Sequence, residues 1–407
     1  MPFVDVTEAP STTGSSRCLL CYSHNWHFQG VREGITELRQ QKAIVGMRVR
    51  SLIIVQSRRL GVDGNLFASE LKQDRSSGVL QAIVLALSQY DKAAVSTNPQ
   101  MQVIHILRRM ALSAHEPGLR SAADWSLRRW GVSIDLPAMQ PDSACRWHVN
   151  SQGQVMVSLP RDRATLGSPA GEAGRSDDES QTPSALNYEL AVSSIEITVA
   201  QFQSFLKSNP DVDHSCIRSY SPTDDCPQTS VTWHEAAAYC NWLSERERLP
   251  PDEWCYELLA PSQIRRYKPA EDSTARAGYR LPTSFKWEYA CRSATESIRS
   301  FGDDPGLLPE YAWYQANAID HSWPVGTKMP NAWGLFDMHG NVWEWCHDAA
   351  EIDRGVPSGE HARILRGGSF FYHPLYIRSA LRNRELSTSR FYGVGFRPGR
   401  NLKPPDD

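Results

Sequence analysis

Residues 331–346 read Asn331-Ala-Trp-Gly-Leu-Phe-Asp-Met-His-Gly-Asn-Val-Trp-Glu-Trp-Cys346, and this stretch decides the fold of the chain. Three tryptophans, two glycines, an Asp and a Glu lie within these sixteen residues, a density that is typical of a framework segment. If the end of the stretch is a β-strand, Trp343 and Trp345 share one face of it and Glu344 lies on the other. We therefore expect the two indoles to be buried in a core, with Glu344 pointing away from them.

The same stretch contains the ligand types of a hard-cation site. Asp337 precedes Glu344 by seven residues, and Gly340 between them can adopt a backbone conformation that other residues avoid. Carboxylates at both ends of a loop, with carbonyl oxygens between them, suit calcium. The sequence therefore predicts a calcium-binding loop here.

The length and charge of the chain indicate more than one part. A chain of 407 residues is expected to form two or three domains. The 43 Lys and Arg nearly balance the 46 Asp and Glu overall, but residues 31–131 contain 15 basic against 8 acidic side chains. We therefore expect two differently charged parts.

The start of the chain has no signature of secretion. No basic region precedes a long apolar run, and no segment approaches about eighteen uninterrupted apolar residues, so we expect neither a signal peptide nor a membrane span. The nine cysteines are scattered without a repeating pattern, which is typical of reduced, buried thiols. The sequence thus predicts a cytoplasmic protein.

Residues 1–34 are predicted to be a poorly ordered leader. Cys18, Cys21, His24 and His27 within it are residue types that bind zinc, spaced by three residues. Familiar zinc sites separate two ligand pairs by a dozen or so residues so that the chain can fold back around the metal. We therefore favour a leader without zinc.

Residues 35–131 carry a helical pattern. Apolar residues recur every three or four positions at 43–53, 79–87 and 101–112. Ser121-Ala-Ala-Asp124 resembles a capping box that would begin a last helix. We predict a small all-α domain of helix pairs, similar to a HEAT array.

The excess of Arg and Lys in the helical domain permits two interpretations. A surface facing nucleic acid is one, but the basic residues form no single cluster in the sequence. A solvated helix face or a docking surface for a partner domain is therefore favoured, and nucleic acid is not expected to be a partner.

Residues 132–185 are predicted to be a strand and a linker that lead into the second domain, 186–402. Apolar residues alternate at Val155, Val157 and Leu159 as in a strand, whereas 161–182 is rich in Gly, Pro, Ser and acidic residues with little to bury. A strand followed by a helix is expected over residues 188–206.

Two further helices have recognisable starts. Thr232-Trp-His-Glu235 is a capping box, and the helix that follows places Cys240 on its core face. Thr283 is a plausible N-cap for a helix over 284–291. Between these helices, residues 245–278 are polar and interrupted by Pro, and we expect a loop with one short helical piece.

Five segments together resemble the formylglycine-generating enzyme family, also called sulfatase-modifying factors, over about residues 150–400. They occur in the order expected of that family. The segments are Val231-Thr-Trp-His-Glu-Ala-Ala-Ala-Tyr-Cys-Asn-Trp-Leu-Ser244, Arg280-Leu-Pro-Thr-Ser-Phe-Lys-Trp-Glu-Tyr-Ala290, Pro330–Trp345, Leu365-Arg-Gly-Gly-Ser369 and Gly395-Phe-Arg397.

The resemblance implies an α+β, C-type-lectin-like fold with much irregular backbone. It places the family's calcium site on Asp337, Gly340, Val342 and Glu344, partly through backbone oxygens. Lys286 departs from the pattern, because the family usually has Glu at this position. The end of the helical part also resembles a segment that precedes this domain in planctomycete-type bacterial proteins.

The family's oxidases convert a sulfatase cysteine to formylglycine with a copper(I) ion held by two cysteines just beyond the Gly-Gly-Ser motif. In this chain Tyr372 and Ile377 stand at these positions, and no cysteine follows Cys346. Soft thiolates select Cu(I), and neither a phenol nor a branched alkyl group can replace them. We therefore expect no copper and assign no catalytic residue.

An iron centre is a weaker possibility. Related sulfoxide synthases take part of their iron site from a His-x3-His-x-Glu motif in a helical domain, whereas residues 35–131 contain only His105 and His115. The histidines near the presumed site are His339, His347, His361 and His373. Imidazoles can hold iron, but these have no definite spacing, so solvated or backbone-bonded histidines are favoured.

Large aromatic residues gather near the end of the chain. Several are consecutive, so that some must point outward from a strand, and exposed aromatics with Arg make good contact surfaces. We expect structural roles for Arg366 and Arg397, which belong to the family pattern. The predicted surface for a protein or peptide ligand consists of Phe370, Phe371, Tyr372, His373, Tyr376, Arg390, Phe391 and Tyr392.

Three functional hypotheses follow. The first is a catalytically divergent member of the family that binds a ligand or senses a partner. The second is an enzyme of the family, either a formylglycine-generating oxidase with an unrecognised site or a non-haem iron oxygenase. The third rests on a resemblance of the Gly-Gly-Ser start and Gly-Phe-Arg end to the variable ligand-binding proteins of diversity-generating retroelements.

Overall fold

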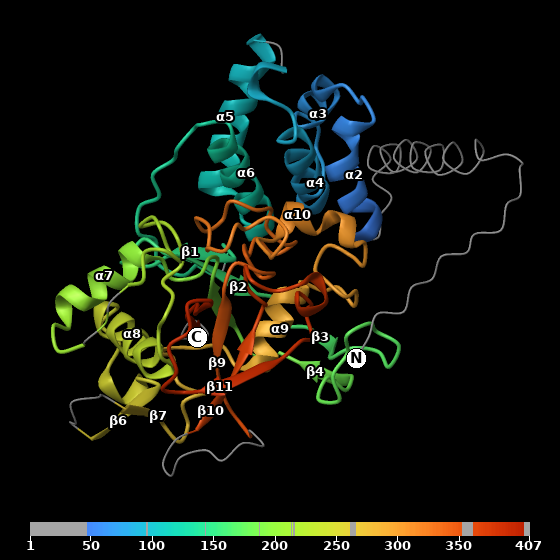
Figure 1. Ribbon diagram of the computed structural model, residues 1–407. Coiled ribbons are helices and arrows are strands. Elements are labelled where there is room, and N and C mark those ends of the chain that lie inside the picture. Colours follow the sequence, from blue (N-terminus) through green and yellow to red (C-terminus); the bar gives the residue numbers. More distant parts are fainter. Residues whose placement is uncertain are drawn as a thin grey trace, which may run out of the picture.

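A computed structural model gives the fold (Figure 1). The residues that it describes are 47–402 except 95, 96, 143, 187, 213, 215, 261–265 and 352–360. The predicted leader and its zinc-type residues therefore lie outside the described part of the chain. Within that part, no helix is both long enough and apolar enough to cross a membrane.

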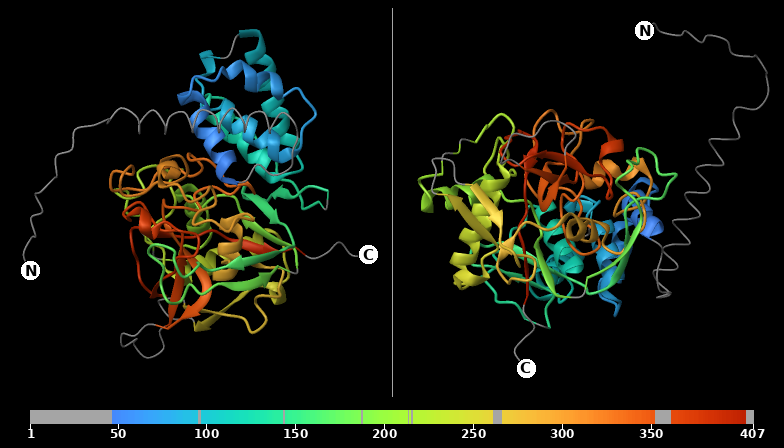
Figure 2. Two further views of the ribbon diagram at one scale, coloured as in Figure 1. Left: turned by 90° about the vertical axis from the view of Figure 1, so that its right-hand side faces the viewer. Right: turned by 90° about the horizontal axis from the view of Figure 1, so that it is seen from below.

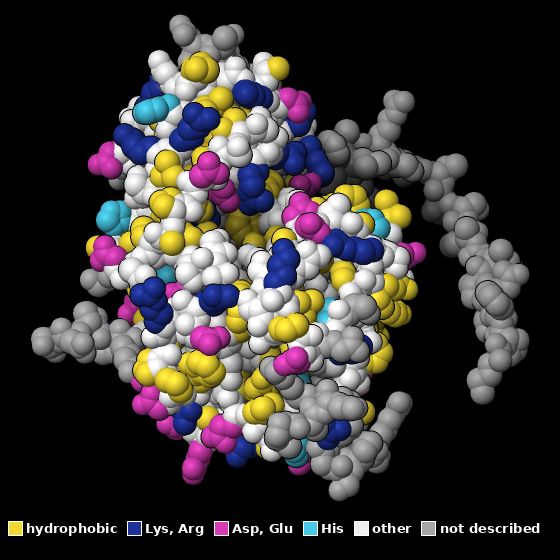
Figure 3. Space-filling view, turned by 90° about the vertical axis from the view of Figure 1, so that its left-hand side faces the viewer, with side chains coloured by type: hydrophobic (Ala, Val, Ile, Leu, Met, Phe, Trp, Pro, Cys, Tyr) yellow, Lys and Arg dark blue, Asp and Glu magenta, His cyan; other side chains and the backbone are white. Residues whose placement is uncertain are grey.

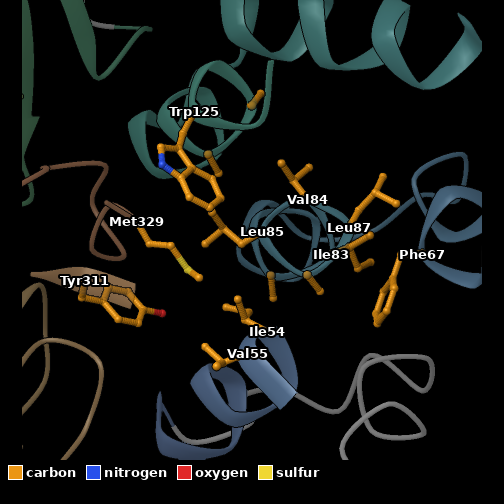
Figure 4. Packing of buried hydrophobic residues seen from close by; sticks show 14 of the residues in the cluster. Ile54, Val55, Phe67, Ile83, Val84, Leu85, Leu87, Trp125, Tyr311 and Met329 are labelled. Atoms are coloured by element: carbon orange, nitrogen blue, oxygen red, sulfur yellow. The ribbon is translucent and has the colours of Figure 1, made fainter. Parts of the chain in front are cut away.

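The N-terminal part is helical, as predicted (Figure 1, top). Its helix α4 has apolar or small side chains on all sides and is buried from Gln81 to Leu87, as expected for a helix surrounded by others. Figure 4 shows side chains of α4 pointing toward Trp125, Ile54 and Phe67 on three other helices. The elements are α2 Met47–Arg59, α3 Gly64–Glu70, α4 Ser77–Leu87, the 3-10 turn η1 Lys92–Ala94, α5 Thr97–Ser113 and α6 Pro117–Arg129.

The predicted capping box at Ser121 is wrong. Helix α6 begins four residues earlier, at Pro117, and its N-cap is Glu116. Proline suits the first turn of a helix because its missing N–H would have no intrahelical acceptor there. Ser121 therefore lies inside the helix, where it is buried.

The helical part packs on the chain's own C-terminal part. Gln81 Nε2 donates to the carbonyl of Asn331 at 3.2 Å, and Trp125 Nε1 donates to that of Thr327 at 3.1 Å. The two parts share one hydrophobic core, in which Tyr311 and Met329 of the C-terminal part lie beside the helices (Figure 4). The other buried residues that the C-terminal part contributes are Phe301, Leu307, Leu308, Ala312, Tyr314, Phe336 and Ile377. Part of the surface that these helices were predicted to offer to a partner domain is thus covered by the C-terminal part of the same chain.

Figure 3 shows one face of both parts. Lys and Arg side chains are scattered over the helical part, at the top, with acidic side chains among them. On this face the basic residues do not gather into one patch.

The C-terminal part contains a five-stranded antiparallel sheet in the order β1-β2-β5-β13-β8. Its strands are β1 Trp147–Val149, β2 Val155–Leu159, β5 Leu190–Ser193, β8 Tyr279–Arg280 and β13 Gly399–Asn401. The first two strands precede residue 186, where we expected the domain to begin. The last strand of the described chain thereby returns beside strands from the start of the domain.

A four-stranded sheet in the order β11-β10-β9-β12 holds the fold-deciding stretch. Its strands are β9 Trp343–Ala350, β10 Ala362–Arg366, β11 Asn383–Leu386 and β12 Val394–Gly395, which runs parallel to β9. Trp343 and Trp345 pack in one core and Cys346 in another, so the two faces of β9 divide as predicted. Both faces of β9 are therefore buried over Trp343–His347, because a core covers each of them.

The C-terminal helices begin where their caps predict. Thr232 and Glu235 form the capping box of α8, and Thr283 accepts a hydrogen bond from the Lys286 N–H at the start of α9. The helices are α7 Val199–Ser208, α8 Trp233–Arg246, α9 Ser284–Arg292 and α10 Leu308–Tyr311, with 3-10 turns η2 Pro251–Glu253, η3 Pro305–Leu307 and η4 Pro374–Tyr376. Between α8 and α9 the chain also forms the hairpin β6 Tyr256–Ala260 and β7 Arg266–Pro269, which the sequence did not predict.

The expected linker at 161–182 is held in place. It contains strand β3 Arg163–Leu166, which pairs with β4 Thr182–Ala185. The loop 167–181 between these strands is bonded to Arg378, which donates to Glu179 at 2.7 Å. The polar composition indicated poor order because the partner of these acidic residues lies about 200 positions away in the sequence.

Candidate functional site

The segment after β10 contains Tyr372 and Ile377, the two positions that the resemblance assigns to the cysteines of the oxidases. Ile377 is fully buried in the core that the helical part shares, and its carbonyl accepts from Arg299 Nε at 2.8 Å. The ring of Tyr372 is partly buried and meets Trp343 edge-on, with 5.3 Å between ring centroids. Both side chains are therefore packing residues, and neither offers a thiolate.

The buried cysteines near this segment are poor candidates for replacing that pair. Cys291 Sγ lies 3.7 Å from both His339 Nε2 and Ser379 Oγ. Burial raises the pKa of Cys291 to about 12, and it raises the pKa of Cys346 well above its ordinary value. Both thiols therefore stay protonated near neutral pH.

The histidines have separate surroundings. Burial lowers the pKa of His339 and of His347 to about 3, so both rings are neutral. His339 Nε2 accepts from the Ser300 N–H at 3.1 Å, whereas His347 lies between Tyr256 and Ser273. His373 caps η4, and His361 is exposed. Among the described residues, no three His, Cys, Asp or Glu side chains form a group that could hold a metal ion.

Glu344 is bonded to cationic and neutral donors. Its Oε1 accepts from Arg397 Nη2 at 2.6 Å, and its Oε2 accepts from Arg397 Nε and from Trp287 Nε1, each at 2.7 Å. Burial alone would lower the pKa of Arg397, but the charge of Glu344 and its hydrogen bonds raise it. Both carboxylate oxygens of Glu344 are thus engaged, and this residue does not fit a calcium ligand.

Asp337 differs from Glu344. It is buried, and its Oδ2 accepts from the Gly326 N–H at 2.6 Å, but its Oδ1 has no hydrogen-bond partner. Burial raises the pKa of Asp337 to about 6. The pKa of Glu196 is raised well above its ordinary value by burial and then by the charge of Asp337. Asp337 thus has one unpaired buried oxygen, and its charge acts on a second buried acidic group, which suits a bound cation.

Gly340 is required by the loop between Asp337 and β9. Its φ is +76°, and a Cβ at this position would lie 2.1 Å from the carbonyl oxygen of Trp313. Only glycine combines this backbone conformation with so close an approach of another chain segment. The predicted conformational role of Gly340 is therefore confirmed.

The predicted ligand surface is only partly a surface. Phe370 is fully buried, which contradicts its placement there, because it packs with Ala318 and Val342 in a small core. Phe371 is half-buried and Tyr392 is 43% exposed, and their ring centroids are 5.0 Å apart. Tyr392 also stacks on Tyr220 at 4.4 Å. Tyr220 was missed because it lies far from the other two in the sequence.

Two tryptophans pack on the same small core. Trp313 and Trp323 stack with 4.3 Å between centroids, and Lys328 Nζ lies 3.7 Å from the centroid of Trp313. Both indoles are half-buried. We call the set Tyr220, Trp313, Trp323, Phe371 and Tyr392 the aromatic surface.

Other members of the predicted surface have identifiable roles. Arg390 donates to Glu235 at 2.7 Å, and this ion pair connects the segment between β11 and β12 to helix α8. Tyr376 is 51% exposed beside Tyr372, and Phe391 is also exposed. The family-pattern residue Arg366 is fully buried and pairs with Glu288 at 3.0 Å, so its predicted structural role is confirmed.

Comparisons with known proteins agree with this architecture. The Sulfatase-modifying factor enzyme 1-like domain matches residues 147–402. The chaperone protein LppX of Paenibacillus barcinonensis is 28% identical over 308 residues, 68% of this chain and 98% of that protein. The formylglycine-generating enzyme of Streptomyces coelicolor is 28% identical over 295 residues, 64% of this chain and 92% of the enzyme.

A solved structure with this likeness is Treponema denticola variable protein 1. It is 26% identical, with a TM-score of 0.49, and the match covers 61% of this chain and 95% of that one.

Proposed function

The chain belongs to the sulfatase-modifying factor family, and we propose that within it this protein is a binding module and not a copper oxidase. The observation that carries the proposal is the packing at the two positions where the oxidases have cysteines. Ile377 is sealed in an apolar core, and Tyr372 lies against Trp343. A Cu(I) site requires soft ligands that these side chains do not supply.

The ligand is proposed to be a protein or peptide that contacts the aromatic surface. Rigid aromatic rings contribute large contact areas at a small cost in side-chain entropy, and they are enriched at binding hot spots. The rings of Tyr392 and Tyr220 stack on each other, and Tyr220 also stacks on the buried ring of Phe370. A protein partner also agrees with the name of the LppX relative, which is a chaperone.

Selection from a displayed peptide library tests this function. We expect the unaltered protein to enrich peptides whose affinity falls at least about tenfold in Tyr392→Ser, because loss of a central aromatic contact typically costs 2 kcal/mol or more. The matched control is Met101→Ser, an exposed apolar residue on helix α5, which should leave affinity unchanged.

The alternative is an oxidase of the family. It predicts that the protein, reconstituted with Cu(I), takes up oxygen and forms an aldehyde on a cysteine-containing sulfatase peptide. That result, or peptides that bind Tyr392→Ser as tightly as the unaltered protein, would refute the binding proposal.

We further propose that calcium binds at Asp337, together with backbone oxygens of Gly340 and Val342. The unpaired Asp337 Oδ1 and the neighbouring Glu196 support this proposal. We leave Glu344 out of this proposed ligand set because both its carboxylate oxygens already accept from Arg397 or Trp287. When bound, calcium would neutralise the buried acidic groups and fix the loop that leads into β9.

Chelation should therefore lower the melting temperature. An ion at a hundred times its dissociation constant stabilises the native state by about 2.7 kcal/mol. Asp337 is deprotonated above a pKa of about 6, so the effect of a chelator should be larger at pH 7.5 than at pH 5. Without calcium, a raised carboxyl pKa makes this group's contribution to stability fall as pH rises from its unfolded value of 3.8 toward 6.

Asp337→Asn should abolish the response to the chelator, whereas the exposed control Asp252→Asn should retain it. Differential scanning calorimetry at both pH values measures the effect. A melting temperature of the unaltered protein that is the same in chelator and in calcium at pH 7.5 would exclude the site.

A further inference from the structure

Lys286 lies in the first turn of helix α9 and is buried, with 3% of its surface exposed. Its Nζ has no hydrogen-bond partner and lies 4.7 Å from the ring centroid of Tyr188. A lysine in the first turn also adds positive charge at the positive end of the helix dipole. The positive charge at this helix end favours a nearby anion. No atom among the described residues accepts a hydrogen bond from Lys286 Nζ.

A second buried cation adjoins Lys286. Arg280 is 1% exposed, and its positive charge acts on both Lys286 and Tyr188. Its Nη2 donates to Asn401 Oδ1 at 2.5 Å, but its Nε has no partner. The ring of Tyr188 thus covers Lys286 Nζ, and Arg280 lies near enough to affect the charge of both residues.

The surrounding groups leave positive charge in excess. Asp348 is the acidic side chain that acts on Lys286, and its Oδ2 already accepts from the Ser284 N–H. Cys255 contributes a thiol whose pKa burial raises, and His347 is neutral because burial lowers its pKa to about 3. Arg363, bonded to the His347 carbonyl at 2.7 Å, acts on His347 together with Arg280 and Lys286, and its Nε has no partner in the described part of the chain.

We propose that Lys286 and Arg280 form a buried site for a small monovalent anion beneath Tyr188. The anion accepts from Lys286 Nζ and Arg280 Nε, the two donors that the protein leaves unpaired. It lowers the cost of burying adjacent positive charges, which is high for an unpaired ammonium group. This site is independent of the aromatic surface and of calcium.

Binding of the anion is coupled to protonation of Lys286. Burial, followed by the charge of Arg280, lowers the pKa of Lys286 to about 7. The ammonium form is therefore the main one at pH 6 and a minor one at pH 8.5. Because an anion interacts more strongly with the charged form, its affinity should fall over this range.

Chlorine-35 NMR with chloride as the probe tests the site. In the unaltered protein we expect line broadening that is at least about threefold greater at pH 6 than at pH 8.5, because about nine-tenths of Lys286 is protonated at the lower pH. Lys286→Met should remove the pH-dependent broadening while leaving a folded protein, since methionine fills a buried space without a charge.

The control is Lys268→Met, which alters an exposed lysine paired with Glu257 on the β6–β7 hairpin. It should broaden the chloride line as the unaltered protein does. Circular dichroism melting of each variant verifies folding. Equal broadening in Lys286→Met and the unaltered protein, or no excess broadening at pH 6 in either, would overturn the proposal.

Discussion

Replacing Arg397 with methionine is expected to lower the free energy of unfolding by about 3–5 kcal/mol, because it leaves a buried carboxylate without its partner. Arg397 is fully buried and donates to both oxygens of Glu344 at 2.6 and 2.7 Å. It also donates to the carbonyls of Ser193 and Phe336, so Arg397 connects Glu344 of β9 to the end of β5. Urea unfolding at pH 7 would measure the loss.

A double-mutant cycle measures how much the Arg397–Glu344 ion pair itself contributes to the free energy of unfolding. Glu344→Gln alone should also destabilise the protein, but adding it to Arg397→Met should cost less than the sum of the two changes, because the unpaired charge is then gone. The exposed pair Arg218–Asp224, with 2.8 Å between nitrogen and oxygen, is the control. Arg218→Met should cost less than about 1 kcal/mol. If Arg397→Met also lowered the free energy of unfolding by less than about 1 kcal/mol, the prediction that burial makes this ion pair costly to break would be wrong.

The ion pair also marks how far the sequence could predict this site. Alternation correctly assigned Trp343, Glu344 and Trp345 to opposite faces of a strand, because that periodicity follows from local backbone geometry. The partner of Glu344 is 53 residues away, and no local rule reveals it. A carboxylate predicted to bind calcium is instead neutralised by an arginine.

The difference between local and distant contacts also explains which other predictions from the sequence were correct. The capping box at Thr232 and Glu235 was predictable because its two hydrogen bonds connect residues within one turn. The contact between Tyr220 and Tyr392 was not, because it depends on how distant loops meet. The resemblance located the fold, but the burial of Phe370 required the tertiary structure.

The interface of the helical part was likewise not readable from its own sequence. A Cβ at Gly118 in helix α6 would lie 2.1 Å from the carbonyl oxygen of Ala332. Helix α6 therefore approaches the C-terminal part more closely than any side chain permits. The resulting shared core encloses Ile377, so the helices help to bury one of the two positions that the resemblance assigns to the oxidases' cysteines.

Replacing Arg378 with methionine is expected to cost about 3–5 kcal/mol and to release the loop 167–181. Arg378 donates to Glu172 at 2.6 Å and to both oxygens of Glu179 at 2.7 Å, and all three side chains are nearly fully buried. Burial alone would raise the pKa of Glu179, but the hydrogen bonds from Arg378 and Ser168 bring it below its ordinary value. Without Arg378, Glu172 and Glu179 would both be buried without the cation that neutralises them.

The pH dependence has a definite sign. A carboxyl whose pKa is lowered on folding stabilises the protein above its unfolded pKa, and this contribution is lost as pH falls through the folded value. For Glu179 the loss begins below its ordinary pKa of 4.5. Arg378→Met should therefore lose more stability, relative to the unaltered protein, at pH 7 than at pH 3.5. Urea unfolding at these two pH values gives the comparison.

Arg384 provides a matched control because it pairs with Asp178 in the same loop but is 39% exposed. Arg384→Met should cost less than about 1 kcal/mol, since exposed ion pairs contribute little. Limited proteolysis followed by mass spectrometry should cut Arg378→Met within 167–181, while the unaltered protein and Arg384→Met remain intact there. Equal protection of this loop in all three proteins would mean that the β3–β4 hairpin holds it without Arg378, and that the buried ion pair is not what orders a segment whose composition is typical of a linker.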